Sequence, residues 1–167
     1  MQKIKFGTDG WRAIIAQEFT VENVARVSEA TGKWLLKNYD NPTVFVGHDC
    51  RFAGALFMER SVKVFLSQGL NVRMSEGFVS TPMVSLAANR FNCQVGVVLT
   101  ASHNPPSYNG YKLKADFGGP LAPEHVQEVE DLIADTCHID LSAINLDSYK
   151  SSGKLKVGDI ETMYVDH

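Results

Sequence analysis

The chain has 167 residues, of which 44% are hydrophobic and 21% are charged, and its formal net charge at pH 7 is −3. This length is enough for one domain with a sizeable hydrophobic core and is short for two full domains. The lack of a basic excess argues against nucleic acid as a partner, and the lack of any long apolar run argues against a membrane span.

Helical spacing of apolar residues predicts three helices in the first half of the chain, over 19–38, 54–69 and 80–91. We expect Thr20 to cap the first helix. We expect Thr81 to cap the third, with Pro82 as its first helical residue. Short apolar and β-branched runs between these helices predict the strands listed here: 43–47, 70–74 and 93–100.

The second half of the chain continues the alternation. A strand is predicted over 111–115, where the run YKLKA follows an Asn-Gly turn and can pair antiparallel at or near a sheet edge. A helix that starts at Pro123 is expected within 120–136. Beyond Cys137 the sequence is more polar and lacks a clear period until a last helix begins near residue 159.

Strands that alternate with helices of ten or more residues favour an α/β fold, because each crossover helix buries a face of the sheet. We therefore expect a three-layer α/β/α sandwich with a mixed, mainly parallel sheet. We assign residues 1–140 to one domain and residues 141–167 to a linker and the truncated start of the next domain.

The cysteines Cys50, Cys93 and Cys137 are odd in number and show no C-x-x-C spacing, so neither a disulfide framework nor a zinc knuckle is expected. The N-terminal segment has no apolar stretch of signal-peptide length. Together these features predict a cytoplasmic protein.

Three polar clusters carry the available chemistry: GTDGWR (7–12), GHDCR (47–51) and TASHNP (100–105). The last two follow predicted strands, and ligands of open α/β sheets bind at the carboxyl ends of strands. Each cluster taken alone can also be an ordinary turn, since Gly, Asp and Asn are turn formers. Together they supply a hydroxyl, two guanidinium groups, an imidazole and an amine at expected strand ends.

Ser102 is the natural nucleophile of these clusters. His103 is its neighbour in sequence, but adjacent side chains of an extended segment point apart and no G-x-S-x-G elbow is present, so a catalytic triad is a weak hypothesis. Phosphate chemistry suits the residues better. Arg12 and Arg51 can each bind two phosphate oxygens at once, and Lys112 can provide a positive charge or transfer a proton. No Walker-type phosphate loop is present.

The segments TASHNPPSYNGYKL, FGTDGWR and VGHDCR resemble the phosphoserine loop, the N-terminal signature and the G-x-D-x-R segment of the α-D-phosphohexomutases, the phosphoglucomutase and phosphomannomutase family. The resemblance covers nearly the whole chain. It implies that this chain is domain I of an enzyme that interconverts hexose 1-phosphates and hexose 6-phosphates through a bisphosphorylated intermediate, with glucose 1,6-bisphosphate as activator.

The resemblance also implies roles for individual residues. Ser102 would carry the phosphoryl group and supply an oxygen to Mg²⁺. Lys112 would act as general acid and base. Arg12 would flank the phosphoserine, and His103 and Asn104 would contact the phosphate or stabilise the loop. Arg51 would bind phosphate or be structural.

The chain departs from the family pattern in length and in missing motifs. It has no D-G-D-x-D metal loop, so the remaining Mg²⁺ ligands are expected outside it, together with the other domains. We therefore expect a fragment that folds but is inactive alone. The sequence ASHNPPSYNGYK of the serine loop resembles enzymes that act on glucose or mannose phosphate more than those that act on amino-sugar phosphates.

Two other functions remain open. A serine hydrolase or phosphatase would use Ser102 with His103. A non-catalytic domain would bind sugar phosphates without transferring a group.

Overall fold

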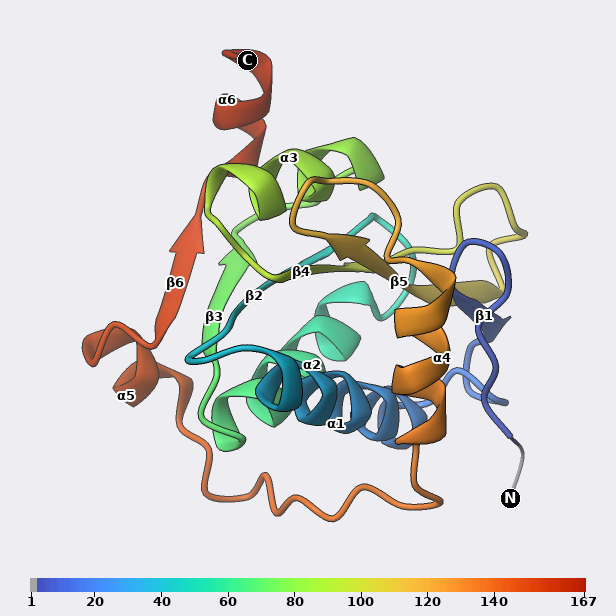
Figure 1. Ribbon diagram of the computed structural model, residues 1–167. Coiled ribbons are helices and arrows are strands. Elements are labelled where there is room, and N and C mark those ends of the chain that lie inside the picture. Colours follow the sequence, from blue (N-terminus) through green and yellow to red (C-terminus); the bar gives the residue numbers. More distant parts are fainter. Residues whose placement is uncertain (1–2) are drawn as a thin grey trace.

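The computed structural model describes residues 3–167 and shows one six-stranded sheet with helices on both faces (Figure 1). The strands are β1 (Trp11–Ile14), β2 (Thr43–His48), β3 (Asn71–Ser75), β4 (Val95–Leu99), β5 (Tyr108–Ala115) and β6 (Leu155–Gly158). The helices are α1 (Val21–Asn38), α2 (Gly54–Ser67), α3 (Thr81–Arg90), α4 (Pro123–Asp131), α5 (Leu146–Ser151) and α6 (Ile160–Val165).

The strand order is β1-β5-β4-β2-β3-β6. β4, β2, β3 and β6 run parallel, whereas β5 pairs antiparallel with both β4 and β1. The predicted α/β sandwich with a mixed, mainly parallel sheet is therefore confirmed. The predicted antiparallel strand is confirmed as well, next to the edge strand β1.

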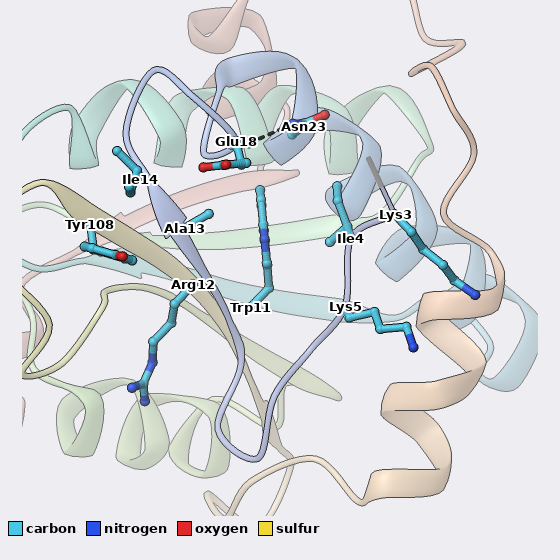
Figure 2. A pocket seen from close by; sticks show the side chains of 10 residues that line it. All are labelled: Lys3, Ile4, Lys5, Trp11, Arg12, Ala13, Ile14, Glu18, Asn23 and Tyr108. Carbon is cyan, nitrogen blue, oxygen red and sulfur yellow. Dashed lines mark hydrogen bonds between the residues drawn. The ribbon is translucent and has the colours of Figure 1, made fainter. Parts of the chain in front are cut away.

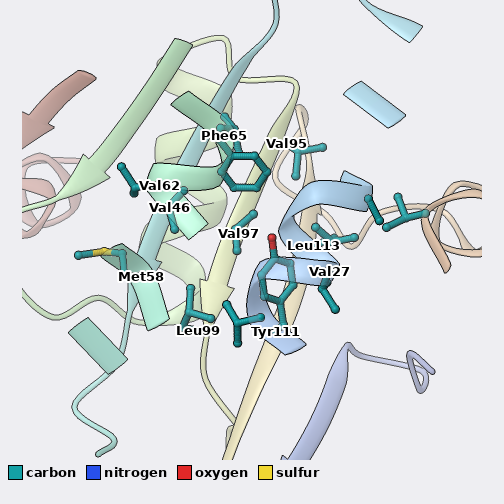
Figure 3. Close-up of a cluster of buried hydrophobic side chains, with 14 of the residues drawn as sticks. Val27, Val46, Met58, Val62, Phe65, Val95, Val97, Leu99, Tyr111 and Leu113 are labelled. Carbon is teal, nitrogen blue, oxygen red and sulfur yellow. The ribbon is translucent and has the colours of Figure 1, made fainter. Parts of the chain in front are cut away.

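The two faces of the sheet bury cores of different size. The larger core lies under α1, α2 and α4, and the smaller one lies under α3, where Ile160 at the start of α6 joins it. β4 contributes to both cores because successive side chains of a strand point to opposite faces. Val97 packs in the larger core (Figure 3), whereas Val98 packs in the smaller one. This two-sided burial explains the uninterrupted apolar run of β4.

Strand β5 alternates in the same way. Tyr111 and Leu113 point into the larger core (Figure 3), so Lys112 and Lys114 point to the face that α3 covers. The Tyr111 hydroxyl lies 3.2 Å from Ser28 Oγ, which donates to Ser61 Oγ at 3.0 Å. This buried hydrogen-bond network joins β5 to α1 and α2.

The prediction of an Asn-Gly turn before β5 is wrong. Asn109 and Gly110 lie inside β5, and the reversal of direction occurs earlier, in the segment after β4. Gly110 is needed there for close approach, since a Cβ at this position would lie 2.4 Å from the Thr100 carbonyl oxygen and 2.9 Å from that of Trp11.

Two helix boundaries also differ from the prediction. Ser80 rather than Thr81 is the N-cap of α3, and its backbone N–H donates to Met83 Sδ at 3.3 Å. Helix α4 ends at Asp131, short of the predicted 136. The following segment is bound to α1 instead, because Arg26 Nε donates to the Ala134 carbonyl at 2.6 Å. The Thr20 cap of α1 is confirmed, with Asn23 N donating to Thr20 Oγ1 at 3.1 Å.

Strands β1 and β6 and helix α5 were not predicted. β6 pairs with β3 and completes the sheet, and the proposed boundary at residue 140 stays a prediction. All three cysteines are free thiols. Within residues 3–167, no helix combines the length and apolarity that crossing a membrane requires.

Candidate functional site

The three polar clusters of the sequence meet at one edge of the sheet. The loop 100–107 joins β4 to β5, the segment 49–53 follows β2, and the turn 7–10 precedes β1. Since β1 lies beside β5, and β2 beside β4, these segments converge on the carboxyl ends of β2 and β4.

Ser102 lies exposed in the loop between β4 and β5 and adopts a left-handed backbone conformation, with φ 55°. This conformation is unfavourable for residues other than glycine and marks functional or constrained positions. His103 is also exposed, and within residues 3–167 its side chain has no hydrogen bond. The structure thus presents the serine hydroxyl to solvent without an imidazole bonded to it.

A chain of hydrogen bonds fixes the start of this loop. The Ser102 backbone N–H donates to Thr100 Oγ1 at 3.0 Å, and Thr100 Oγ1 donates to Asp49 Oδ2 at 2.5 Å. The other carboxylate oxygen of Asp49 accepts the Arg51 backbone N–H at 3.0 Å. The loop carrying the serine is therefore tied directly to the segment that follows β2.

The Arg51 side chain reaches into the same loop. Its Nε lies 3.5 Å from Asp49 Oδ2. Its two terminal nitrogens donate to four carbonyl oxygens of the loop and the first residue of β5, those of Ser102 (2.8 Å), Asn104 (2.6 Å), Pro105 (2.8 Å) and Tyr108 (2.9 Å). The predicted role of Arg51 in phosphate binding stays untested, but its four terminal N–H groups all have acceptors.

Asp9 joins the two other predicted cations. Its Oδ2 lies 2.5 Å from Lys112 Nζ and 3.1 Å from Arg12 Nη2. Arg12 Nη1 in turn donates to Asn104 Oδ1 at 3.1 Å, which connects the group to the Ser102 loop. Partial burial raises the pKa of Asp9, but the hydrogen bond and charge of Lys112 outweigh it, and the pKa lies below its ordinary value.

A second lysine lies behind the first. Lys112 and Lys114 are two residues apart on β5, so both point to the α3 face, where only 4% and 8% of their surfaces are exposed. Burial lowers the pKa of Lys114. The charge of Asp9 opposes this change, and the charge of Lys112 adds to it. The site therefore contains two nearly buried lysines, of which Lys112 contacts the Asp9 carboxylate.

Two hollows flank Arg12. One, of about 350 Å³, lies between the N-terminal segment and β1 and is lined by Lys3, Ile4, Lys5, Trp11, Arg12, Ala13, Ile14, Glu18, Asn23 and Tyr108. Arg12 and Trp11 point to opposite sides of β1 there, so the guanidinium faces away from the core that contains the indole (Figure 2). The other, of about 340 Å³, is lined by Lys5, Gly7, Thr8, Asp9, Gly10 and Arg12. Arg12 can thus meet an anion that approaches from solvent.

The residues predicted from sequence are brought together, and the structure adds three more. Asp9 connects Arg12 with Lys112, whereas Asp49 and Thr100 together connect Arg51 with Ser102. Asp9 and Asp49 belong to the polar clusters GTDGWR and GHDCR, which was the only sequence signal for them. Thr100 likewise belongs to the third cluster, TASHNP. In the described part of the chain, no group of three or more His, Cys, Asp or Glu side chains is arranged to hold a metal ion.

Comparison with known proteins places this geometry in a family. Residues 3–138 match the model of the phosphoglucomutase/phosphomannomutase α/β/α domain I. A phosphoglucomutase/phosphomannomutase of Thermococcus kodakarensis is 39% identical over 128 residues, covering 76% of this chain and 28% of that protein. A phosphoglucosamine mutase of Bacillus cereus is 38% identical over 128 residues, covering 77% of this chain and 28% of its own length.

Solved structures agree in fold. A crystal structure from Thermus thermophilus, described as that of a phosphomannomutase, superposes with a TM-score of 0.87 at 34% identity over 99% of this chain and 35% of that one. A phosphoglucomutase from Paramecium superposes with a TM-score of 0.77 at 19% identity, over 97% of this chain and 34% of that one, and shows the fold alone. The chain thus spans less than a third of the length of the curated relatives it matches.

Proposed function

This chain belongs to the phosphoglucomutase/phosphomannomutase family as its domain I, and from that premise we propose that it is the phosphoserine-bearing domain of a longer phosphohexomutase. Ser102 would carry the phosphoryl group that is exchanged with a hexose phosphate. The observation that supports this most directly is the exposed, left-handed Ser102 in a loop bonded to Arg12, with Lys112 and Arg12 on one carboxylate.

The proposed reaction needs little covalent chemistry from the protein. The bond between phosphorus and Ser102 Oγ breaks as a bond to a sugar hydroxyl oxygen forms, and the hydroxyl proton leaves for a nearby base. The transfer then runs in reverse from the other phosphate of the bisphosphorylated sugar and restores phosphoserine. Catalysis of such a transfer comes mainly from positioning and from charges aimed at the phosphoryl oxygens.

Each polar group near Ser102 has a part in this scheme. Arg12 would stabilise the phosphoryl oxygens, and Asn104 orients its guanidinium. Lys112 would carry the proton between the sugar hydroxyl and the site. His103 stays a secondary candidate, because its side chain is exposed and has no hydrogen bond within residues 3–167. Without a base bonded to Ser102, the hydrolase alternative has less support than the mutase.

Magnesium fits this site only in part. A phosphate on Ser102 would offer a hard oxygen ligand, as Mg²⁺ prefers, and the ion would neutralise charge on the transferring group when bound. The carboxylates that complete its shell would come from the remainder of the parent protein, since no acidic cluster of sufficient size lies within residues 3–167.

The identity of the hexose phosphate is a separate part of the proposal. The relatives include a phosphoglucomutase/phosphomannomutase and phosphoglucosamine mutases at nearly equal identity, 39% and 38%. The segment ASHNPPSYNGYK of the loop and β5 leads us to propose a glucose or mannose phosphate rather than the amino sugar.

Intact mass spectrometry of the full-length protein tests the function. After incubation with glucose 1,6-bisphosphate, we expect one added phosphate on Ser102. The matched control is Ser107→Ala, which changes another exposed serine of the same loop and should leave the phosphate in place. An unphosphorylated Ser102, together with full mutase activity of Ser102→Ala, would reject the proposal. Labelling of Ser102 by a fluorophosphonate, with turnover of p-nitrophenyl esters, would favour the hydrolase.

A second test uses the 167-residue chain alone. We expect it to fold and to show no mutase turnover, because surfaces outside it complete the site. Calorimetry with hexose phosphates would show whether it binds them, as the non-catalytic alternative requires.

A further inference from the structure

Arg51 has an unusual set of partners for a residue expected to bind phosphate. Its terminal nitrogens point into the protein and donate to the carbonyls of Ser102, Asn104, Pro105 and Tyr108. The side chain is 13% exposed, so water replaces these bonds only partly if they are lost.

The convergence of four carbonyls on one group requires a donor of matching shape. A guanidinium offers five N–H donors in a rigid plane, whereas an ammonium offers three donors on a flexible stem. Arg51 directs four donors to the loop and its Nε toward Asp49. Lysine at this position retains the charge but lacks the number and plane of the donors.

The loop also contains a conformation that needs outside support. Ser102 has φ 55°, which a serine adopts only when its surroundings determine it. Arg51 bonds the carbonyl of Ser102 itself, and Asp49, which Arg51 contacts, accepts the hydroxyl that fixes the Ser102 N–H through Thr100. Both sides of the serine backbone are therefore tied to the same Asp49–Arg51 pair.

We propose that Arg51 is a positioning residue that sets the backbone of the Ser102 loop, and that it is not a phosphate ligand. The structural part of this inference stands on the hydrogen bonds alone. Its consequence for phosphoryl transfer rests on the proposed function, since a loop that loses Arg51 would present the Ser102 hydroxyl in many directions instead of one.

Nuclear magnetic resonance of this chain tests the structural part. The variants are Arg51→Lys and Arg51→Gln, and the matched control is Arg26→Gln, which removes a buried arginine that donates to the Ala134 carbonyl, far along the chain from this loop. The readouts are the nuclear Overhauser effect (NOE) between the Ser102 N–H and its own Hα, which is strong at positive φ, and amide exchange of Ser102, Asn104 and Tyr108. These amides donate to Thr100 Oγ1, the Ala101 carbonyl and the Pro105 carbonyl, not to Arg51.

We expect both Arg51 variants to lose the strong intraresidue Ser102 NOE and to exchange these amides roughly tenfold faster or more. Arg26→Gln should leave both readouts as in the wild type. A wild-type Ser102 NOE and wild-type amide exchange in Arg51→Gln would overturn the proposal.

Kinetics of the full-length protein test the consequence. Arg51→Lys should lower kcat far more than it raises KM, and Arg51→Ala should regain part of kcat when guanidinium is added at a non-denaturing concentration. A phosphate ligand would behave differently, with an unchanged loop in the spectra and a raised KM, and that pattern would contradict the inference. If wild-type Ser102 takes no phosphate, the proposed function fails while the spectra still decide the role of Arg51.

Discussion

Asp9→Asn is expected to destabilise the fold although Asp9 lies on the surface, because its carboxylate is the counter-ion of a buried amine. The Lys112 side chain is 5% exposed, and its Nζ lies 2.5 Å from Asp9 Oδ2. Asparagine has nearly the same shape as aspartate but no charge. The substitution therefore isolates the charge of the pair.

The magnitude follows from the unequal burial of the two partners. Removing one partner of a fully buried ion pair costs about 3–5 kcal/mol, whereas exposed pairs contribute about 0–1 kcal/mol. The Asp9 side chain is 45% exposed and partly screened by water, whereas the amine is not. We therefore expect Asp9→Asn to lower the free energy of unfolding by about 1–2 kcal/mol.

Urea unfolding of the 167-residue chain measures this effect in a double-mutant cycle. The variants are Asp9→Asn, Lys112→Met and the double variant, with Asp147→Asn as control. Asp147 pairs with Lys150 at 3.2 Å, but its side chain is 88% exposed, so its loss should cost less than about 0.5 kcal/mol. A coupling energy between Asp9 and Lys112 below about 0.3 kcal/mol would refute the reasoning.

The pH dependence gives an independent check with a definite sign. The pKa of Asp9 in the folded chain lies below its ordinary value of 3.8, so its contribution to stability is present above that value and is lost as pH falls through the folded pKa. The difference between wild type and Asp9→Asn should therefore shrink in acid. A difference that stays constant below the folded pKa would show that the charge of Asp9 is not its cause.

Three further predictions concern the elements that support the site. Tyr111→Phe should lower the free energy of unfolding by about 0.5–1.5 kcal/mol in urea, because it removes the buried hydroxyl 3.2 Å from Ser28 Oγ. Gly110→Ala should lower the free energy of unfolding by about 3 kcal/mol or prevent folding, since its Cβ would lie 2.4 Å from the Thr100 carbonyl oxygen. In the control Gly77→Ala the new Cβ meets no atom within 4 Å, and the free energy of unfolding should change by less than about 1 kcal/mol. Glu29→Gln should speed amide exchange at His138, whose N–H the Glu29 carboxylate accepts at 3.0 Å. Burial raises the pKa of Glu29, but its bonds to Lys33 and His138 lower it more, so this difference should fade as pH falls through the folded pKa.

The α/β class and the long helices followed from the sequence because their signals are local and repeated. Helix α1 has 18 residues with apolar positions at helical spacing, and β4 is apolar on both faces. Strands β1 and β6 have four residues each, too few for a period, and each lies at a sheet edge. Their partners are distant in sequence, so only tertiary structure defines them.

The Asn-Gly pair shows how a strong local signal is overridden. In isolation it favours a two-residue hairpin turn. In the fold, Gly110 pairs with Arg12 of β1, and its missing Cβ allows the Thr100 and Trp11 carbonyls to approach. The glycine is required for close approach between strands rather than for a turn.

The candidate site was predictable in its residue types and not in its connections. Ser102, Lys112 and Arg12 were recognisable from motifs, but their contacts join distant positions. Lys112 and Asp9 are 103 residues apart, and Arg51 and Pro105 are 54 residues apart. Which carboxylate pairs with which cation is set by strand order and register, and these depend on the whole sheet.

The alternation of β5 links the stability of the core to the chemistry of the site. Tyr111 is fully buried between Gly110, which the neighbouring carbonyls crowd, and Lys112, which contacts Asp9. Because successive residues of a strand point to opposite faces, any change that shifts Tyr111 in the core also shifts the Lys112 amine on the other face. The position of that amine is thus determined by packing in the larger core as much as by Asp9. Substitutions of buried residues such as Val97 and Tyr111 should therefore alter the phosphoryl transfer proposed for the parent protein before they unfold this domain.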